Sequence, residues 1–458
     1  MDHGPLIARQ RAFFLTGATA TAEFRRGKLE ALRDGLIARE ADLLAALHAD
    51  LRKSPHEAYA TEIGFVLGEI RHAIKNLPAW MKPERRRAPV LAWPSHAELR
   101  REPFGVALIV GPWSYPLQLL LAPLVGAIAA GNTAVLKPSE FAPHTAAMIA
   151  TLMAETFEEE FIAVIEGGQD CAEALLREKF DTIFFTGSTR TGRAVMAAAA
   201  RHLTPVTLEL GGKCPCIVSA DAPIELTARR IVWGKFMNAG QTCVAPDHVW
   251  VDRRVAPALL EALRKAVCDF YGENPQQSPD YGRIINRRHF DRLQAMLSDG
   301  KILLGGRTDA DDLYLEPAIL TDVGRDSGVM TEEIFGPILP VLEYDDISHV
   351  LTTLRDQPLP LALYLFTADS ALHERVLAET RSGGVCINDT ISHILGRDLP
   401  FGGVGESGMG MYHGRASFEC FSHRRAVLRR SLRTDPAFRY PPPGASLSVL
   451  KRMMRFFG

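Results

Sequence analysis

Short apolar runs alternate with longer amphipathic stretches between about residues 105 and 202. Runs such as VALIV, TAVLK and TIFF have the length and the β-branched or aromatic content of buried strands. The stretches between them, including residues 142–156 and 189–202, have the length and apolar spacing of helices. Regular alternation of this kind predicts a parallel, doubly wound sheet.

A second set of strand-like runs follows this region: VTLEL, CIVSA, HVWVD, ALYLF and GVCIN. They predict a second lobe over about residues 209–420, so the expected fold class is α/β with two doubly wound parallel-sheet lobes. Upstream, residues 26–80 repeat charged and apolar positions at helical spacing. We expect residues 1–81 and 104–208 to form the first lobe together.

Residues 82–103 interrupt this pattern. The segment is rich in proline and arginine, which predicts an extended excursion from the body of the molecule. The longest apolar stretch, residues 115–131, contains two prolines and a glutamine and is short for a membrane span. The N-terminal stretch lacks an uninterrupted apolar core, so we expect no signal peptide there.

The C-terminal residues 424–458 form a basic tail with nine Lys and Arg residues and one acid. On a helical wheel of about 100° per residue, its last 13 residues separate an apolar face from a basic face. The apolar face contains Leu447, Val449, Leu450, Met453, Met454, Phe456 and Phe457, and the basic face contains Lys451, Arg452 and Arg455. Two interpretations stay open: a helix lying on an anionic membrane surface, or a helix docked on its own core or a partner subunit.

Composition limits the function classes. A chain of 458 residues exceeds one ordinary core, and its 47% hydrophobic and 23% charged residues are typical of globular proteins. A net charge of −2 gives no basis for nucleic-acid binding. Seven sparse cysteines indicate no disulfide framework and favour a reducing, cytoplasmic compartment. Cys214 and Cys216 have no partners at zinc spacing, so we interpret them as packed thiols and expect no metal.

The segment FFTGSTRTGR is a candidate phosphate site. An apolar strand ends at Thr186, Gly187 and Ser188, and a helix is expected to begin at once. Backbone N–H groups at a helix start are unsatisfied and can receive phosphate, and Gly187 and Gly192 permit close approach. A G-x-G-x-x-G pattern also occurs at residues 403–408, near the end of the second lobe. We do not expect it to bind nucleotide, because no convincing strand precedes it and no apolar helix follows.

Two further residues are candidates for catalysis. Glu209 lies in the apolar run VTLELGG, where burial would raise the pKa of its carboxyl toward the range useful for a general base. The structural alternative is a strand-end glutamate held by a salt bridge. Cys243 stands between a polar run and an apolar run, and only His248 offers an adjacent cation that would favour its thiolate. The structural alternative for Cys243 is a packed thiol.

Taken in order, these segments resemble the NAD(P)-dependent aldehyde dehydrogenase superfamily over about residues 20–423. The resemblance rests on GPWSYP, GNTAVLKPSE, FTGSTRTG, TLELGGK, GQTCVAP, EEIFGPILPV and LPFGGVGESGMGMYHG. The compact N-terminus, CVAPD and the ending YHG…SFECFSHRR are most similar to the class 3 branch, which includes fatty and aromatic aldehyde dehydrogenases. The resemblance implies oxidation of medium- or long-chain aliphatic or aromatic aldehydes with NAD or NADP.

The resemblance also implies roles for individual residues. Cys243 would attack the aldehyde to give a thiohemiacetal, and a thioester would remain after hydride transfer. Glu209 would activate the water that hydrolyses the thioester, and its presence favours water over coenzyme A or phosphate as the acyl acceptor. The implied cofactor-binding residues are Trp113, Lys137, Glu140, Thr186, Gly187, Ser188, Gly192, Leu210, Gly211, Glu333 and Phe335. Glu140 would bind the ribose 2′-hydroxyl and repel a 2′-phosphate, yet class 3 relatives often accept both cofactors, so the choice stays open.

Ser114 departs from the family pattern. The family usually has asparagine in PWNYP, where the side-chain amide helps to hold the developing oxyanion, and this chain has PWSYP. Serine also donates a hydrogen bond but has a shorter reach, and the backbone N–H of Cys243 would be the other donor. Loss of one such donor typically costs about 3 kcal/mol. We therefore expect either compensation by repositioning or a slower enzyme.

Two other functions are weighed against oxidation. A thioester or ester hydrolase would need Cys243 and Glu209 but no dinucleotide, and KPSE and FTGS count against it. A binding protein without catalysis would need neither residue. By resemblance we expect a homodimer, with residues 82–103 and part of the C-terminal region as the oligomerisation element. If the tail lies on a membrane, which is the first of its two interpretations, the contact would be peripheral and at the inner face.

Overall fold

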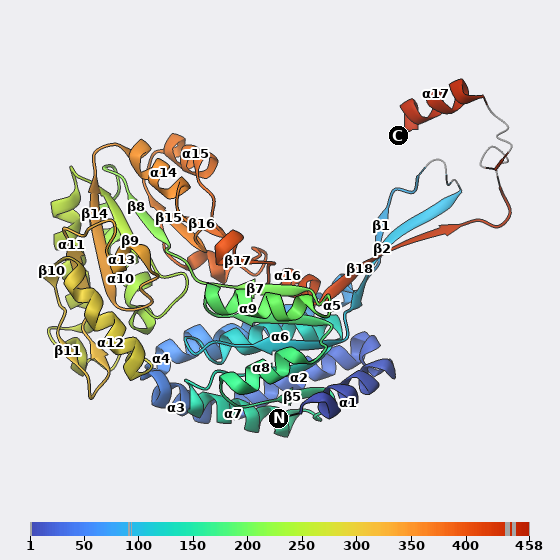
Figure 1. The fold of residues 1–458 in the computed structure, drawn as a ribbon, viewed down its shortest axis with the longest axis horizontal. Helices are drawn as coiled ribbons and strands as arrows, with labels where there is room; N and C mark the ends of the chain where they lie inside the picture. Colours follow the sequence, from blue (N-terminus) through green and yellow to red (C-terminus); the bar gives the residue numbers. More distant parts are fainter. Residues whose placement is uncertain (1, 90–91, 93, 436–439, 442–445, 458) are drawn as a thin grey trace.

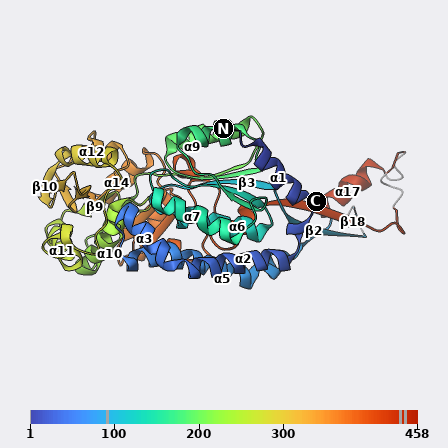
Figure 2. The ribbon, with the colours of Figure 1, turned by 90° about the horizontal axis from the view of Figure 1, so that it is seen from below.

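The computed structural model describes residues 2–89, 92, 94–435, 440–441 and 446–457, apart from the side chains of Met453, Phe456 and Phe457. Two α/β lobes lie side by side, and a narrow arm projects from the first of them (Figures 1 and 2). The sheets of both lobes are built mainly from parallel strands with helices packed on them. The expected α/β class with two parallel-sheet lobes is confirmed.

The first lobe contains a six-stranded sheet in the order β17-β7-β6-β3-β4-β5. Its strands are β3 (Val106–Val110), β4 (Thr133–Lys137), β5 (Ile162–Val164), β6 (Thr182–Thr186), β7 (Val206–Glu209) and β17 (Gly408–Met409). Its helices are α1 (Gly4–Leu15), α2 (Ala22–Ala38), α3 (Glu40–Leu51), α4 (Pro55–Ala58), α5 (Gly64–Trp80), α6 (Gln118–Ala130), α7 (Pro143–Thr156), α8 (Gln169–Arg177), α9 (Thr189–Ala200) and α16 (Arg415–Cys420). Strands β3 to β7 are parallel because each returns through a helix.

The second lobe contains a seven-stranded sheet in the order β10-β13-β14-β9-β8-β15-β16. Its strands are β8 (Pro215–Val218), β9 (His248–Asp252), β10 (Lys301–Leu304), β13 (Ala318–Thr321), β14 (Ile338–Tyr344), β15 (Ala362–Phe366) and β16 (Gly384–Ile387), and β11 (Thr308–Asp309) pairs with β12 (Tyr314–Leu315) beside it. Its helices are α10 (Ile224–Phe236), α11 (Ala256–Tyr271), α12 (Arg287–Met296), α13 (Gly328–Thr331), α14 (Ile347–Arg355) and α15 (Ser370–Glu379). Only β10 runs antiparallel to its neighbour in this sheet, as an edge strand.

The glycine-rich loop at residues 403–408 differs from its expected place near the end of the second lobe. It returns to the first lobe, where β17 pairs antiparallel with β7 and Gly408 lies opposite Glu209. A Cβ atom added to Gly408 would lie 2.1 Å from the carbonyl oxygen of Leu208. Glycine is therefore required for close contact between two backbones, and the loop supports the strand that carries Glu209.

The expected excursion and the start of the expected tail form one structure. Strands β1 (Glu84–Arg86), β2 (Ser95–Pro103) and β18 (Ser422–Arg430) make a three-stranded antiparallel sheet that forms the arm (Figure 1). Residues 424–430 are thus a strand rather than the beginning of a basic tail. Their positive charge is matched by β2, since Arg425 lies 3.1 Å from Glu102 and Arg429 lies 3.1 Å from Glu98.

Helix α17 (Leu447–Phe457) lies beyond the arm and away from both lobes (Figure 1). The helix expected at the C-terminus is therefore confirmed in its secondary structure. Leu447, Val449, Leu450 and Met454 are exposed large apolar side chains, and Lys451, Arg452 and Arg455 are also exposed. The rest of the expected tail, residues 436–439, 442–445 and 458, lies outside the described residues. Among the helices that the structure describes, none is long and apolar enough to cross a bilayer.

Candidate active site

The carboxyl ends of the first sheet carry several of the expected residues. Because β4, β6 and β7 are parallel, their last residues meet at one edge of the sheet, where α/β proteins bind ligands. Lys137 ends β4, Thr186 ends β6 and Glu209 ends β7. Two residues separate β6 from helix α9, and the side chain of Ser188 caps the helix by accepting the N–H of Thr191.

One cavity of about 710 Å³ collects most of the expected site. The expected residues that line it are Trp113, Ser114, Thr186, Gly187, Ser188, Glu209, Leu210, Gly211, Cys243, Glu333 and Phe335. Three others do not line it. Lys137 and Glu140 form an ion pair of 2.8 Å with each other. Gly192 allows the side chain of Leu210 to pack against the backbone of α9, because a Cβ atom at Gly192 would lie 2.6 Å from that side chain.

Burial disfavours the charged forms of both Cys243 and Glu209. Burial, followed by the nearby Glu333 and Glu209, raises the pKa of the Cys243 thiol to about 12. Burial also raises the pKa of Glu209 well above its usual range. Neither carboxylate oxygen of Glu209 has a hydrogen-bond partner among the described residues, so the salt-bridge alternative for this glutamate is wrong. An unpartnered buried carboxyl group in a cavity wall is suited to accept a proton from a ligand or a water.

His248 does not supply a cation to Cys243. Its ring is fully buried, burial lowers its pKa, and its Nδ1 has Asp247 as its charged partner, at 3.7 Å. Cys214 and Cys216 are fully buried, as expected for packed thiols. The Cys214 thiol donates to the carbonyl oxygen of Cys243 at 3.4 Å and so supports the cysteine loop.

A largely buried ion pair joins three segments that carry site residues. The Lys213 ammonium pairs with Asp247 and also donates to the carbonyl oxygens of Val329 and Glu332, at 2.7 and 2.9 Å. The second carboxylate oxygen of Asp247 accepts the N–H of Ile334 at 3.0 Å. The pair therefore links the segment after Glu209, the segment after Cys243 and the segment that contains Glu333.

Three cationic or aromatic side chains of α12 also line the cavity: Arg288, His289 and Arg292. His289 contacts the ring of Trp113 with 4.9 Å between centroids, and burial lowers its pKa to about 4. Arg292 donates to the carbonyl oxygens of Glu333 and Ile334. No local pattern in the sequence indicated these residues, because their helix reaches the cavity only through the packing of the second lobe.

The cavity walls fit a dinucleotide. A helix start with a glycine before it presents backbone N–H groups for phosphate. A Cβ atom on Gly211 would lie 2.0 Å from the carboxylate of Glu333, so glycine keeps that wall open beside a group that can bind ribose hydroxyls. Trp113 and Phe335, with 5.2 Å between their ring centroids, form an apolar wall of the kind that a planar ring requires.

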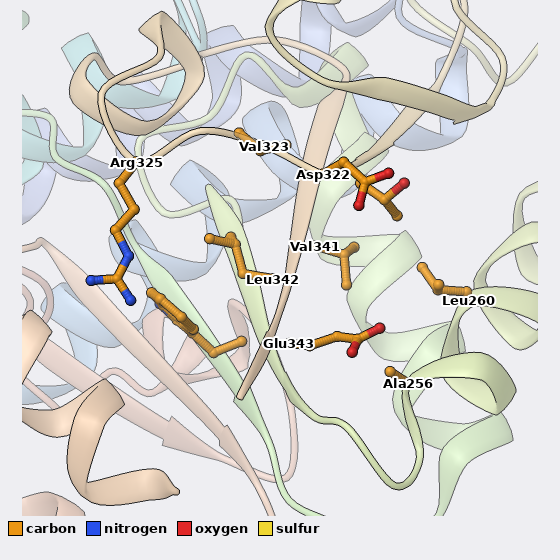
Figure 3. Close-up of a pocket in the computed structure, with 10 residues that line it drawn as sticks. Ala256, Leu260, Asp322, Val323, Arg325, Val341, Leu342 and Glu343 are labelled. Atoms are coloured by element: carbon orange, nitrogen blue, oxygen red, sulfur yellow. The ribbon is translucent and has the colours of Figure 1, made fainter. Parts of the chain in front are cut away.

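A separate cavity of about 320 Å³ lies in the second lobe, between α11 and β14 (Figure 3). Ala256 and Leu260 of α11 lie on one side of it, and Asp322 and Arg325 approach from the loop after β13. Its lining mixes charges of both signs and contains none of the expected catalytic or cofactor-binding residues. The larger cavity is therefore the one suited to the chemistry.

Comparisons with known proteins agree with this site. The sequence pattern of the aldehyde dehydrogenase family matches residues 6–427. The chain is 45% identical to 4,4′-diaponeurosporen-aldehyde dehydrogenase of Staphylococcus aureus over 97% of both chains. It is 46% identical to aldehyde dehydrogenase family 3 member A2 of Pongo abelii, over 96% of this chain and 91% of the relative. A solved structure described as the substrate-bound state of Staphylococcus aureus AldH superposes with a TM-score of 0.96 at 44% identity, covering 98% of this chain and 99% of that chain.

Proposed function

The chain belongs to the aldehyde dehydrogenase family, in its class 3-like branch, and from that premise we propose that Cys243 is the nucleophile and Glu209 the base. The reaction is the oxidation of an aldehyde to a carboxylic acid with NAD or NADP. Family membership leaves the hydrolase and the binding-protein alternatives without support. The observation that carries the residue roles is the shared cavity of Cys243 and an unpartnered Glu209.

The proposed first step is attack of the Cys243 sulfur on the aldehyde carbon. The thiol must first lose its proton, because the thiolate is the nucleophile. Glu209, when ionised, accepts this proton directly or through a water, and its raised pKa makes it a stronger base than an exposed carboxylate. The hydroxyl of Ser114 and the N–H of Cys243 hold the oxyanion that forms on the former carbonyl oxygen.

The bound cofactor supplies the acceptor for the hydride that leaves the thiohemiacetal carbon. A thioester then remains on Cys243. Glu209 first releases the Cys243 proton to solvent. It then takes a proton from a water, the water oxygen attacks the thioester carbon, and the carboxylic acid leaves as the thiolate is restored. Glu333 binds the nicotinamide ribose, Gly187 and Ser188 bind the pyrophosphate, and Lys137 and Glu140 bind the adenosine ribose.

We propose medium- or long-chain aliphatic or aromatic aldehydes as substrates. Support comes from the apolar cavity residues Trp113, Leu119 and Phe335 and from a relative whose name specifies a diaponeurosporen-aldehyde. The test is absorbance of the reduced nicotinamide with NAD or NADP and aldehydes from acetaldehyde to hexadecanal and benzaldehyde. Reduction that rises with chain length and vanishes in Cys243→Ala is expected. A Cys243→Ala variant that still reduces cofactor would exclude Cys243 as the nucleophile.

We also propose that the protein is a cytoplasmic homodimer assembled through the arm of β1, β2 and β18. The arm extends from the body as a three-stranded sheet, and none of the seven cysteines forms a disulfide in the structure (Figure 1). A small sheet of this kind buries little surface in one chain, which favours a partner. Light scattering should give twice the mass of one chain, and a monomer at micromolar concentration would contradict the assembly.

Helix α17 is proposed to bind an anionic membrane surface. Four of its apolar side chains are exposed beside three exposed cations, which is the arrangement of interfacial helices. Deleting residues 446–458 should abolish co-sedimentation with vesicles that contain anionic lipid, whereas the full chain should bind them less tightly at high salt. Equal sedimentation of both proteins would contradict the membrane role and favour docking on protein.

A further inference from the structure

The loop before Cys243 contains a strained turn that is held by side chains from distant segments. Asn238 and Ala239 have φ values of 53° and 50°, and Gly240 follows with φ 73°. Residues other than glycine rarely adopt this left-handed region, and two in succession persist only where surrounding contacts determine them. Asn238, Ala239 and Gln241 are all at most 1% exposed, so the contacts are internal to the protein.

Gln241 fixes the turn from the second lobe. Its side-chain amide donates to the carbonyl oxygens of Asn238 and Arg283, at 3.0 and 2.9 Å, and its side-chain oxygen accepts the N–H of Ile285 at 3.0 Å. The backbone N–H of Asn238 donates to Glu57 of the first lobe at 2.8 Å. The turn is therefore anchored in both lobes.

The side chain of Asn238 extends this anchor to the segment that carries Ser114. Its amide nitrogen donates to the carbonyl oxygens of Ser114, at 2.8 Å, and of Gln241, at 2.9 Å. Both neighbours are acceptors, so the nitrogen rather than the oxygen of the amide must face them. One side chain thus spans the turn that leads to Cys243 and the peptide that follows Ser114.

A second donor reaches the same carbonyl oxygen of Ser114 from the first lobe. The ammonium of Lys53, which is fully buried, donates to it at 3.0 Å and pairs with the equally buried Glu62 at 2.5 Å. The other oxygen of Glu62 accepts the N–H groups of Leu117 and Gln118. Lys53 also lies 3.9 Å above the ring of Tyr115. The Tyr115 hydroxyl is hydrogen-bonded to Thr242, next to Cys243.

We propose that Lys53 and Asn238 are positioning residues for the oxidation, because they hold the Ser114 peptide at a fixed place relative to Cys243. This role rests on the proposed function, in which Ser114 donates to the oxyanion. A serine side chain is short, so its hydroxyl can serve only if its backbone is held close to the reacting carbon. Misplacement by about 1 Å at such a site can cost 100-fold in rate.

The test compares Asn238→Ala, Asn238→Gly and the neutralised pair Lys53→Met/Glu62→Gln. The last variant keeps an oxygen at residue 62 for the two N–H groups that it accepts. The measurements are the pre-steady-state burst of reduced cofactor with a long-chain aldehyde and the cofactor dissociation constant from fluorescence titration. We expect the burst to slow about 10- to 100-fold in each variant. Cofactor affinity should stay within about twofold of the wild-type value, because the substituted side chains do not line the cavity that would bind the cofactor.

Combining Asn238→Ala with the Lys53→Met/Glu62→Gln pair should slow the burst by less than the product of the separate effects, because both donors act on one oxygen.

Arg25→Met is the matched control. Arg25 is a buried cation that donates to the carbonyl oxygens of Thr19 and Ala129, none of which lines the cavity, and its loss should lower stability but leave the burst unchanged.

Two outcomes overturn the positioning role alone. The first is a wild-type burst rate in any folded variant, including Asn238→Gly. The second is a loss of cofactor affinity as large as the slowing of the burst. Recovery in Asn238→Gly would show that the turn conformation, not the amide, matters. A wild-type protein that reduces no cofactor with any aldehyde overturns both this role and the proposed function, and that outcome is thereby distinguished from failure of the positioning role alone.

Discussion

Two carboxylates near Cys243 are buried to the same degree but have opposite surroundings. Glu209 is 3% exposed and Asp247 is 4% exposed. Glu209 has no hydrogen-bond partner for either oxygen among the described residues, and burial raises its pKa well above the usual range. Burial also opposes ionisation of Asp247, but Lys213 and other nearby partners outweigh it and hold its pKa well below the usual range.

The difference teaches that hydrogen-bond and ionic partners, rather than burial, distinguish a carboxylate suited to a reaction from one that stabilises the structure. A carboxylate without partners destabilises the fold, and such groups are retained where a reaction needs them. A carboxylate with a largely buried cation and an N–H donor instead joins segments of the chain. Under the proposed roles, Glu209 belongs to the first class and Asp247 to the second, although Asp247 is only four residues from Cys243.

The largest expected effect is on turnover in Glu209→Gln. Removing the base should lower kcat by about 10²- to 10⁴-fold, because a general base contributes on that scale. If Cys243 can still lose its proton to water, one equivalent of reduced cofactor should appear and turnover should then stall at the thioester. Quenched-flow detection of the acyl-enzyme by mass spectrometry checks this. Full turnover in Glu209→Gln would remove the distinction between the two carboxylates.

The next effect is on stability in Lys213→Met. This change leaves Asp247 buried without its cation, and breaking a buried pair typically costs about 3–5 kcal/mol of unfolding free energy. Denaturant unfolding followed by tryptophan fluorescence measures the loss. The double variant Lys213→Met/Asp247→Asn, which keeps an acceptor for Ile334, should recover most of it. A Lys213→Met protein as stable as wild type would show that the pair is not architectural.

The pH dependence of stability should have opposite signs for the two groups. Folding lowers the pKa of Asp247, so its contribution is present above the unfolded value and is lost as pH falls through the folded value. Folding raises the pKa of Glu209, so its ionisation destabilises the protein as pH rises from the unfolded value through the folded value. Relative to wild type, Glu209→Gln should therefore gain stability as pH rises, and Asp247→Asn should lose it.

At pH 8 the gain in Glu209→Gln should be about 1 kcal/mol, the usual size for relieving such a site, or about 2 °C in Tm. Thermal unfolding measures the two slopes, for Glu209→Gln between about pH 5 and 8 and for Asp247→Asn below about pH 5, because an unfolded aspartate titrates near pH 4. Shifts of the same sign would mean that the two carboxylates have equivalent surroundings.

The smallest effect is expected at Glu140, a carboxylate that is 35% exposed and paired with Lys137. If it faces the adenosine ribose, Glu140→Gln removes repulsion of a 2′-phosphate. Exposed charges interact by less than about 1 kcal/mol, so the ratio of kcat/KM with NADP to that with NAD should rise about three- to fivefold. The exposed Glu160→Gln controls for net charge, and an unchanged ratio would place the ribose elsewhere.

Local patterns predicted the parts of the molecule that depend on neighbouring residues. Alternating apolar runs predicted most strands and helices of the first lobe and strands β8, β9, β15 and β16 of the second, because burial of a strand or of a helix face repeats at a fixed spacing. The run VTLEL was expected in the second lobe, but it is β7 of the first sheet, and β10, β13 and β14 were not expected. Glu209 was recognisable because a carboxylate interrupts an apolar strand. Family resemblance then supplied a set of residues, most of which line one cavity.

Only the tertiary structure decided which distant segments meet. Residues 424–430 carry the charge of a basic tail, yet they form β18 because β2 provides its partner strand and its glutamates. The cations of α12, the Lys213–Asp247 pair and the two donors to Ser114 also join residues far apart in sequence. The sequence determined the two-lobe class and the candidate nucleophile and base. Their partners, and so their ionisation and placement, depended on long-range packing that periodicity does not encode.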